Sequence, residues 1–269
     1  MADIEIEKIE TDADDAAEVS ELIALLEQRN ATYGLLSRLY IKEFDQELLD
    51  EMHEMLYPVE TGERDTNEGY LLIATYLSNL WSESLEELRI DFSRCFFGDG
   101  VDAFSAAYPY ESVYTSEKRL MMEKARFEVL AIYRAHGMKK HDSWHEGEDH
   151  IALEMEFERH MGERTIEALR AGDEDKAQKL LKVQYDFVKK HLVSWAPMMT
   201  ADLKRFAQTK MYRGLAYLTD GFLKTDRQFL KDLLFDEENA EQAAGEEQKE
   251  SEQPVAQTVA QPVAQPAEQ

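Results

Sequence analysis

The sequence is poor in features that mark secreted or membrane proteins. It has a single cysteine, Cys95, so no disulfide can form within the chain, and this fits a reducing compartment. No run of about 18 apolar residues occurs, and no basic-then-apolar leader opens the chain. We therefore expect a soluble, cytoplasmic protein without stable membrane insertion.

Basic residues are also scarce. The 269 residues include 30 Lys and Arg against 56 Asp and Glu, which gives a formal net charge of −26. Such a charge repels nucleic acid and anionic membranes, and it attracts a basic partner. Residues 1–16 contain seven acidic residues and one lysine, and residues 236–269 contain nine and one, so more than half of the excess lies in the two ends.

The usual catalytic and metal-binding motifs are missing. No histidine follows a glutamate at Glu-x-x-His spacing, so a carboxylate-bridged di-metal site is excluded. There is no Gly-x-Ser-x-Gly elbow and no phosphate-binding loop, and Cys95 stands among phenylalanines, as an inert buried thiol does. We predict a binding protein, not an enzyme, with no metal and no cofactor. A metal-binding helical protein stays open as an alternative, because four histidines lie within fifteen residues: His136, His141, His145 and His150.

Helical periodicity fills the chain between its ends. From residue 19 to residue 41, apolar residues recur every three or four positions, which indicates a helix with one apolar stripe. No segment alternates with period two, so we predict an all-α domain of about ten helices over residues 17–236. The expected helices after the first are 45–56, 68–81, 84–97, 116–137, 149–170, 173–191, 200–223 and 226–234. Ser84 is a plausible cap, and Gly137 stands where a left-handed stop belongs.

The two ends are predicted to be disordered. Residues 1–16 are acidic, and residues 237–269 end in a repeat of the type PVAQ that contains no large apolar residue beyond valine. Such segments cannot bury enough surface to order themselves. Two long connections, 97–115 and 136–148, interrupt the helices, and connections of this length tend to be functional.

A charged junction stands at the end of the second connection. The stretch GEDHIALEMEFERHMG, residues 147–162, places Glu148, Asp149 and His150 just before a helix. Two alternatives stay open: Asp149 serves only as a helix cap, and His150 only pairs with Glu154 one turn later. His160 lies ten residues after His150, about 15 Å along a helix, so the two cannot share one ion, and His160 is expected at the surface.

Three stretches, in order, resemble the TorD/DmsD family of cytoplasmic molybdoenzyme chaperones. They are LRIDFSRCFFGDGVDAFSAAYPYESVY (88–114), EGEDHIALEMEF (146–157) and the segment from 187 to 226 that contains HLVSWAP. The family has an aromatic-rich helix running into Phe-x-Gly, then Pro-x-Glu-Ser-Val-Tyr, a Glu-Pro-Asp-Asp-His loop and His-Leu-x-x-Trp-x-Pro. Here Asp149 and His150 match the loop, whereas Gly147 replaces its proline and Glu148 its first aspartate.

The resemblance implies an all-helical, non-catalytic chaperone. Such a protein binds the twin-arginine leader peptide, and in some members the apo form, of a molybdenum oxidoreductase and holds it for cofactor insertion before export. A NarJ-type chaperone for a non-exported client is the alternative. Some family members form domain-swapped homodimers, for which 136–148 is the expected hinge here. Trp81 is assigned either to a binding groove or to the core. The residues expected to bind the peptide are Glu148, Asp149, His150, Tyr110, Glu111, Ser112, Tyr114 and Trp81.

Overall fold

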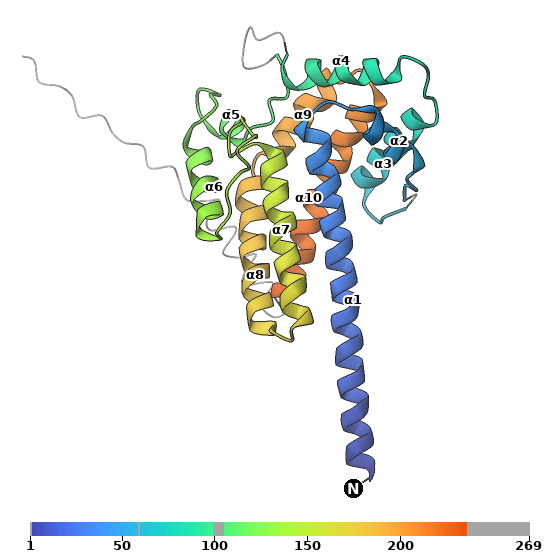
Figure 1. Cartoon of the computed structure of the whole chain (residues 1–269), viewed down its shortest axis with the longest axis vertical. Coiled ribbons are helices and arrows are strands. Elements are labelled where there is room, and N and C mark those ends of the chain that lie inside the picture. Colours follow the sequence, from blue (N-terminus) through green and yellow to red (C-terminus); the bar gives the residue numbers. More distant parts are fainter. Residues whose placement is uncertain (1, 59, 99–104, 236–269) are drawn as a thin grey trace, which may run out of the picture. The chain divides into compact units, whose positions relative to one another are not determined.

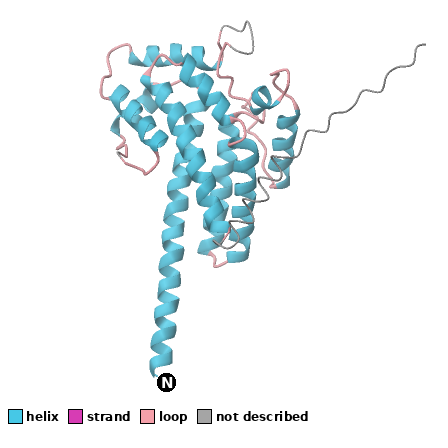
Figure 2. Ribbon diagram, turned by 180° about the vertical axis from the view of Figure 1, so that it is seen from behind, coloured by secondary structure: helices cyan, strands magenta, loops and turns pink. Residues whose placement is uncertain are grey.

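Helices make up nearly all of the regular structure. A computed structural model of the chain describes residues 2–58, 60–98 and 105–235, and of residues 2–15 it describes only the backbone. The helices are α1 (Ala2–Ile41), α2 (Gln46–Glu54), α3 (Arg64–Leu77), α4 (Ser84–Phe96), α5 (Glu111–Thr115), α6 (Lys124–Ala135), α7 (Ile151–Arg170), α8 (Glu174–Phe187), the π-helical turn η1 (Val188–Leu192), α9 (Ala196–Phe206) and α10 (Lys210–Leu234) (Figure 1). Within these ranges the only β pairing is one isolated bridge (Figure 2). The all-α prediction is confirmed.

Four helices, α1, α7, α8 and α10, form the scaffold of the fold. α1 packs along α7, α7 along α8, and α10 against α3, α8 and α9 (Figure 1). Large side chains between them are fully buried, among them Tyr33, Tyr40, Phe96, Trp195 and Tyr212. Burial of such aromatic side chains is a major source of stability.

Two glycines let α3 and α10 approach closely. A Cβ atom on Gly69 would lie 2.5 Å from the backbone nitrogen of Leu218, and one on Gly214 would lie 2.8 Å from the carbonyl oxygen of Gly69. Both distances are shorter than a van der Waals contact, and the atoms that would be met belong to the backbone. Any larger residue would therefore push the two helices apart.

A buried ionic cluster ties α1, α7, α8 and α10 together. Arg29 donates to Asp226 at 2.5 Å, to Glu158 at 2.6 Å and to Gln184 at 2.5 Å, and Tyr33 donates to Asp226 at 2.7 Å. One arginine faces two carboxylates. Burial, and then the charge of Asp226, raises the pKa of Glu158 to about 8 in spite of Arg29.

The predicted helix boundaries are partly wrong. The helix expected to start at Ser116 begins at Lys124, because Arg119 (φ 51°) and Met122 (φ 62°) turn the chain through the left-handed region. α10 runs without the break expected near residue 225. The break falls at 207–209, where Asp91 accepts the backbone N–H groups of Gln208 and Thr209.

Other expectations have mixed outcomes. Gly137 is left-handed (φ 70°), as predicted, but the cap position of α4 is Glu83, not Ser84, which is the first helical residue. The disorder predicted for residues 1–16 stays a prediction, and the tail 237–269 lies outside the described residues. Among the helices described, none is both long enough and apolar enough to cross a membrane.

Candidate functional site

The two long connections meet at the N-terminal end of α7. Tyr110 and His150 form an antiparallel bridge, the backbone nitrogen of Glu111 donates to the carbonyl of Asp149 at 2.9 Å, and that of Ile151 donates to Pro109 at 2.9 Å. The two motifs are 37 residues apart in sequence, yet the fold joins them. We call Tyr110, Glu111, Ser112, Glu148, Asp149 and His150 the junction cluster.

Asp149 connects α5 to the start of α7. Its Oδ2 accepts hydrogen bonds from the backbone nitrogen of Ser112 at 3.0 Å and from the Ser112 hydroxyl. Asp149 is 1% exposed and Ser112 is fully buried. The interpretation of Asp149 as the cap of α7 is wrong, since it holds the first turn of α5 instead.

His150 is the residue that caps α7. Its Nδ1 accepts the backbone N–H of Ala152 at 3.1 Å, and the alternative, a side-chain pairing with Glu154, is not among the hydrogen bonds of the described chain. The ring lies edge-on between Tyr110 and Trp144, at centroid distances of 5.1 and 5.2 Å. Burial lowers the pKa of His150 to about 3, so the ring is neutral at physiological pH.

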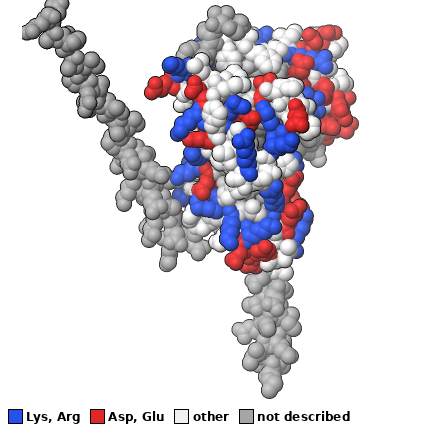
Figure 3. Space-filling model, turned by 60° about the vertical axis from the view of Figure 1, so that its left-hand side comes forward, with Lys and Arg blue, Asp and Glu red and all other residues white. Residues whose placement is uncertain are grey.

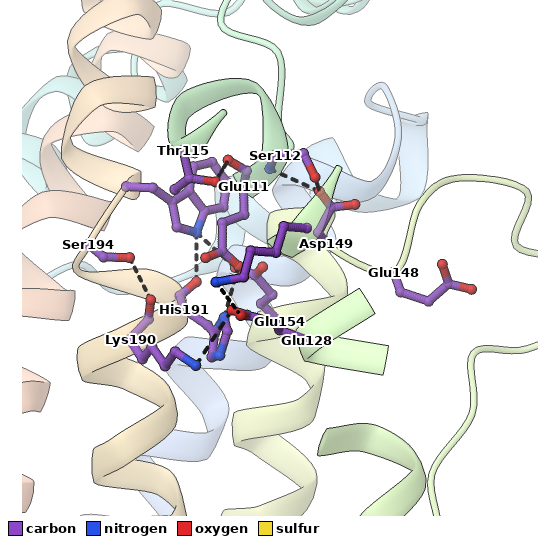
Figure 4. A network of polar contacts seen from close by, with 12 residues as sticks. Glu111, Ser112, Thr115, Glu128, Glu148, Asp149, Glu154, Lys190, His191 and Ser194 are labelled. Atoms are coloured by element: carbon purple, nitrogen blue, oxygen red, sulfur yellow. Dashed lines mark hydrogen bonds and ion pairs between the residues drawn. The ribbon is translucent and has the colours of Figure 1, made fainter. Parts of the chain in front are cut away.

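Glu148 points away from the other junction carboxylates (Figure 4). Arg126 donates to its Oε2 at 2.5 Å, and Lys140 lies 3.3 Å from its Oε1. Burial alone would raise the pKa of Glu148, but the hydrogen bonds from Arg126 and Lys140 outweigh it and the pKa lies below its usual value. Glu148 therefore fixes the connection 136–148 onto α6.

A second layer of buried polar groups supports the junction from below (Figure 4). Glu111 accepts from, or donates to, His191 Nδ1 at 3.0 Å, and Trp195 Nε1 donates to Glu154 at 3.1 Å. Burial, together with the charges of Glu111 and Asp149, raises the pKa of Glu154 well above its usual value. Burial and the neighbouring carboxylates thus favour the neutral form of Glu154.

The sequence interpretation missed part of this layer. It considered Glu154 only as a partner of His150 and gave no separate role to His191 and Trp195, which are buried here. One signal was available in the sequence. Glu154 and Glu158 lie on the same stripe of α7 as Ile151 and Met155. A carboxylate on an apolar stripe is buried, so its charge needs a buried partner.

Two predicted site residues lie apart from the cluster's centre. The ring of Tyr114 stacks on Trp195 at 5.8 Å, and its hydroxyl donates to Asp202 at 3.1 Å. Trp81 is 59% exposed in the turn between α3 and α4, where it lines a different cleft. The core interpretation of Trp81 is wrong, and its role in peptide binding stays a prediction.

No metal centre emerges from the histidine-rich connection. Within the described ranges, no group of three or more His, Cys, Asp and Glu side chains is arranged to hold a metal ion. His150 caps a helix and His141 contacts the hydroxyl of Ser143 at 2.7 Å. His160 lies at the surface beside Glu163, as expected. The Cys95 thiol is fully buried, and burial raises its pKa.

The fold is all-helical, and the buried polar groups of the junction cluster hold the connections in place by hydrogen bonds. Comparison with known proteins gives its family. The model of the family described as nitrate reductase delta subunit matches residues 62–201, just over half of the chain. The chain belongs to this family. The match covers α3 through most of α9, and so includes the whole junction cluster and Trp81.

Relatives of known name are chaperones. The chaperone protein TorD of Vibrio cholerae serotype O1 is 29% identical over 223 residues, which cover 80% of this chain and 97% of the relative. Those of Photobacterium profundum and Vibrio atlanticus are each 26% identical, over 79% and 77% of this chain and 98% and 96% of theirs. The resemblance to the TorD/DmsD family is confirmed.

Proposed function

We propose that the protein is a system-specific chaperone of a molybdenum-cofactor oxidoreductase. It binds the twin-arginine leader of the apo client in the cytoplasm and holds the client for cofactor insertion before export. It acts by binding and carries out no reaction. The observation that carries the proposal is the junction cluster, in which the two family motifs form one buried, hydrogen-bonded unit.

The burial of the junction cluster determines how it takes part in binding. Asp149, Ser112 and His150 are at most 4% exposed, so they contribute by positioning the residues around them and offer little surface for direct contact. Above them lie the exposed Glu146, which accepts the Tyr110 hydroxyl at 2.5 Å, and the half-buried Trp144. A carboxylate beside aromatic rings suits a segment that carries arginine next to apolar residues.

The charge distribution supports a basic client segment. Residues 43–91 contain fourteen Asp and Glu against two arginines, whereas residues 174–235 contain twelve Lys and Arg against seven acids. On the face drawn in Figure 3, Lys and Arg side chains are correspondingly abundant. The net charge of −26 is therefore unevenly distributed along the chain. A cationic segment is attracted to the acidic stretch 43–91 more than to residues 174–235.

The alternatives are less well supported. The named relatives that align with this chain over nearly their full length are TorD chaperones, which favours an exported client over the NarJ-type alternative. A domain-swapped homodimer with its hinge at 136–148 stays a prediction. Light scattering coupled to size exclusion would identify such a dimer by its mass.

Titration with leader peptides tests the proposed function. Synthetic leaders of the exported molybdoenzymes from the same organism are titrated into the full chain by calorimetry, each in Arg-Arg and Lys-Lys forms. We expect saturable binding of one Arg-Arg leader and weaker binding of its Lys-Lys form, because guanidinium groups bind carboxylates through two parallel hydrogen bonds. Absence of binding to every leader contradicts the proposal.

A surface variant then tests whether the junction takes part. Glu146→Gln removes one exposed charge above the junction cluster, and we expect it to weaken the Arg-Arg leader several-fold. Glu167→Gln, an exposed acid further along α7, is the matched control and should bind as the unaltered chain does.

A further inference from the structure

A second surface feature stands out on α4. Trp81 is 59% exposed and Ile90 is 51% exposed, and both line one open cleft of about 250 Å³. We call this cleft the α4 groove; its walls are Trp81, Glu83, Glu86, Glu87, Ile90, Asp91 and Arg94 together with Gln208 and Thr209. α4 meets the core through Leu88, Phe92, Cys95 and Phe96, so Ile90 is not needed for packing. Neighbouring exposed apolar side chains of this size often mark interaction sites.

Three carboxylates of the α4 groove are left without a neutralising cation. Glu83 occupies the cap position of α4 but makes no capping hydrogen bond. Of the three, only Glu87 accepts a side-chain hydrogen bond within the described chain, from the Tyr76 hydroxyl at 2.8 Å. The one cation that lines the groove, Arg94, is paired with Asp91 at 2.9 Å. The groove lies in the stretch 43–91, where acids outnumber bases fourteen to two.

The walls of the α4 groove are fixed by buried contacts. Asp91, 1% exposed, accepts the backbone N–H groups of Gln208 and Thr209 at 3.0 and 2.7 Å, which holds the α9–α10 connection against α4. The Ser84 hydroxyl accepts the backbone N–H of Trp81 at 2.8 Å and so fixes the turn that presents the indole. A site held in this way loses little entropy when a ligand binds.

We infer that the α4 groove binds the arginine pair at the head of the client's leader peptide. The inference rests on the proposed function and adds a location separate from the junction cluster. Guanidinium groups pair with carboxylates through two parallel hydrogen bonds and stack on an indole, whereas a lysine ammonium does neither as well. Ile90 offers an apolar contact for the residue that follows the arginines.

The geometry also leads from the α4 groove toward the junction cluster. At the other end of α4, the carbonyl of Cys95 accepts the backbone N–H of Ala107 at 2.7 Å, and the chain reaches Tyr110 three residues later. The α4 groove and the junction cluster are thus connected through α4 and the segment 105–110.

The test compares two triple variants of equal charge. In the full chain, Glu83→Gln, Glu86→Gln and Glu87→Gln are combined, and the control combines Glu47→Gln, Glu51→Gln and Glu54→Gln on the exposed face of α2. Both lie in the acidic stretch 43–91, so they change long-range attraction alike. We expect the groove variant to weaken the Arg-Arg leader about tenfold or more and the control less than about threefold, since loss of charge-assisted contacts exceeds loss of steering.

The preference for arginine provides the second readout. The ratio of Arg-Arg to Lys-Lys affinity should fall toward one in the groove variant and in Trp81→Leu, and stay unchanged in the α2 control. An unaltered ratio and affinity in the groove variant overturns this inference but leaves the proposed function intact. Failure of the unaltered chain to bind any leader contradicts the proposed function, and this inference with it.

Discussion

The junction cluster and the α4 groove both contain several carboxylates, but the two sets differ in their surroundings. In the junction cluster, Glu111 and Asp149 are 4% and 1% exposed and contact His191 and the Ser112 hydroxyl. Glu154, in the layer that supports the cluster, is 0% exposed and accepts from Trp195. Glu83 and Glu86 are exposed and have no ion-pair partner among the described residues. Buried charges must be compensated inside the fold, whereas exposed ones stay free for a ligand. The junction carboxylates therefore stabilise the fold, whereas the groove carboxylates are exposed and open to a ligand.

The largest effect is expected from Asp149→Ala. The substitution leaves the backbone N–H and hydroxyl of Ser112 buried without their acceptor, which costs about 3 kcal/mol of unfolding free energy. Urea unfolding followed by circular dichroism measures it. Glu167→Gln is the control, and an Asp149→Ala variant as stable as the control would contradict the buried role of Asp149.

His150→Asn is expected to change the response of stability to pH. The pKa of His150 is lowered to about 3 in the folded state, against about 6.5 when unfolded. The unfolded state thus binds the proton first, so the stabilising effect of neutral His150 is complete above pH 6.5 and is lost as pH falls toward 3. The slope is about 1.4 kcal/mol per pH unit, or about 2 kcal/mol between pH 6.5 and 5.

The asparagine variant isolates this titration, because asparagine can cap α7 without gaining a proton. Urea unfolding of both proteins at several pH values between 5 and 8 gives the two curves. The variant's curve should be flatter below pH 6.5 by about the slope given above. Parallel curves would show that His150 does not titrate in this way.

A smaller effect is expected at Gly147, where the family has proline. A Cβ atom on Gly147 would lie 2.7 Å from Asp149 Oδ1 and 3.7 Å from the Tyr110 ring. Glycine is thus needed here for space. Gly147→Ala should lower the unfolding free energy by about 1.5 kcal/mol. Gly172→Ala tests the opposite case, since a Cβ there meets no atom and only its left-handed φ of 71° is unfavourable.

The sequence was sufficient to predict the all-α class, because helical periodicity is a local signal, and the order of the motifs was sufficient to indicate the family. The contact between the two motifs is a tertiary feature that the structure adds. It could not show burial. Asp149 and His150 look like exposed binding groups in the sequence, and only the packing of α5 against the start of α7 encloses them. The boundaries of α6 and α10 failed for a similar reason: the turn at Arg119 and the Asp91 contact with Thr209 depend on tertiary structure.

The smallest effect on stability is expected in the α4 groove, and it completes the comparison. Because Glu83, Glu86 and Glu87 face solvent, their combined replacement by glutamine should change the unfolding free energy by no more than about 0.5 kcal/mol. Removal of repulsion among like charges can even raise it slightly. Urea unfolding on the sample used for leader titration measures both properties together. Loss of leader affinity with unchanged stability would show that the groove carboxylates act in recognition and not in folding. A loss of stability as large as that of Asp149→Ala would show that they also support the fold.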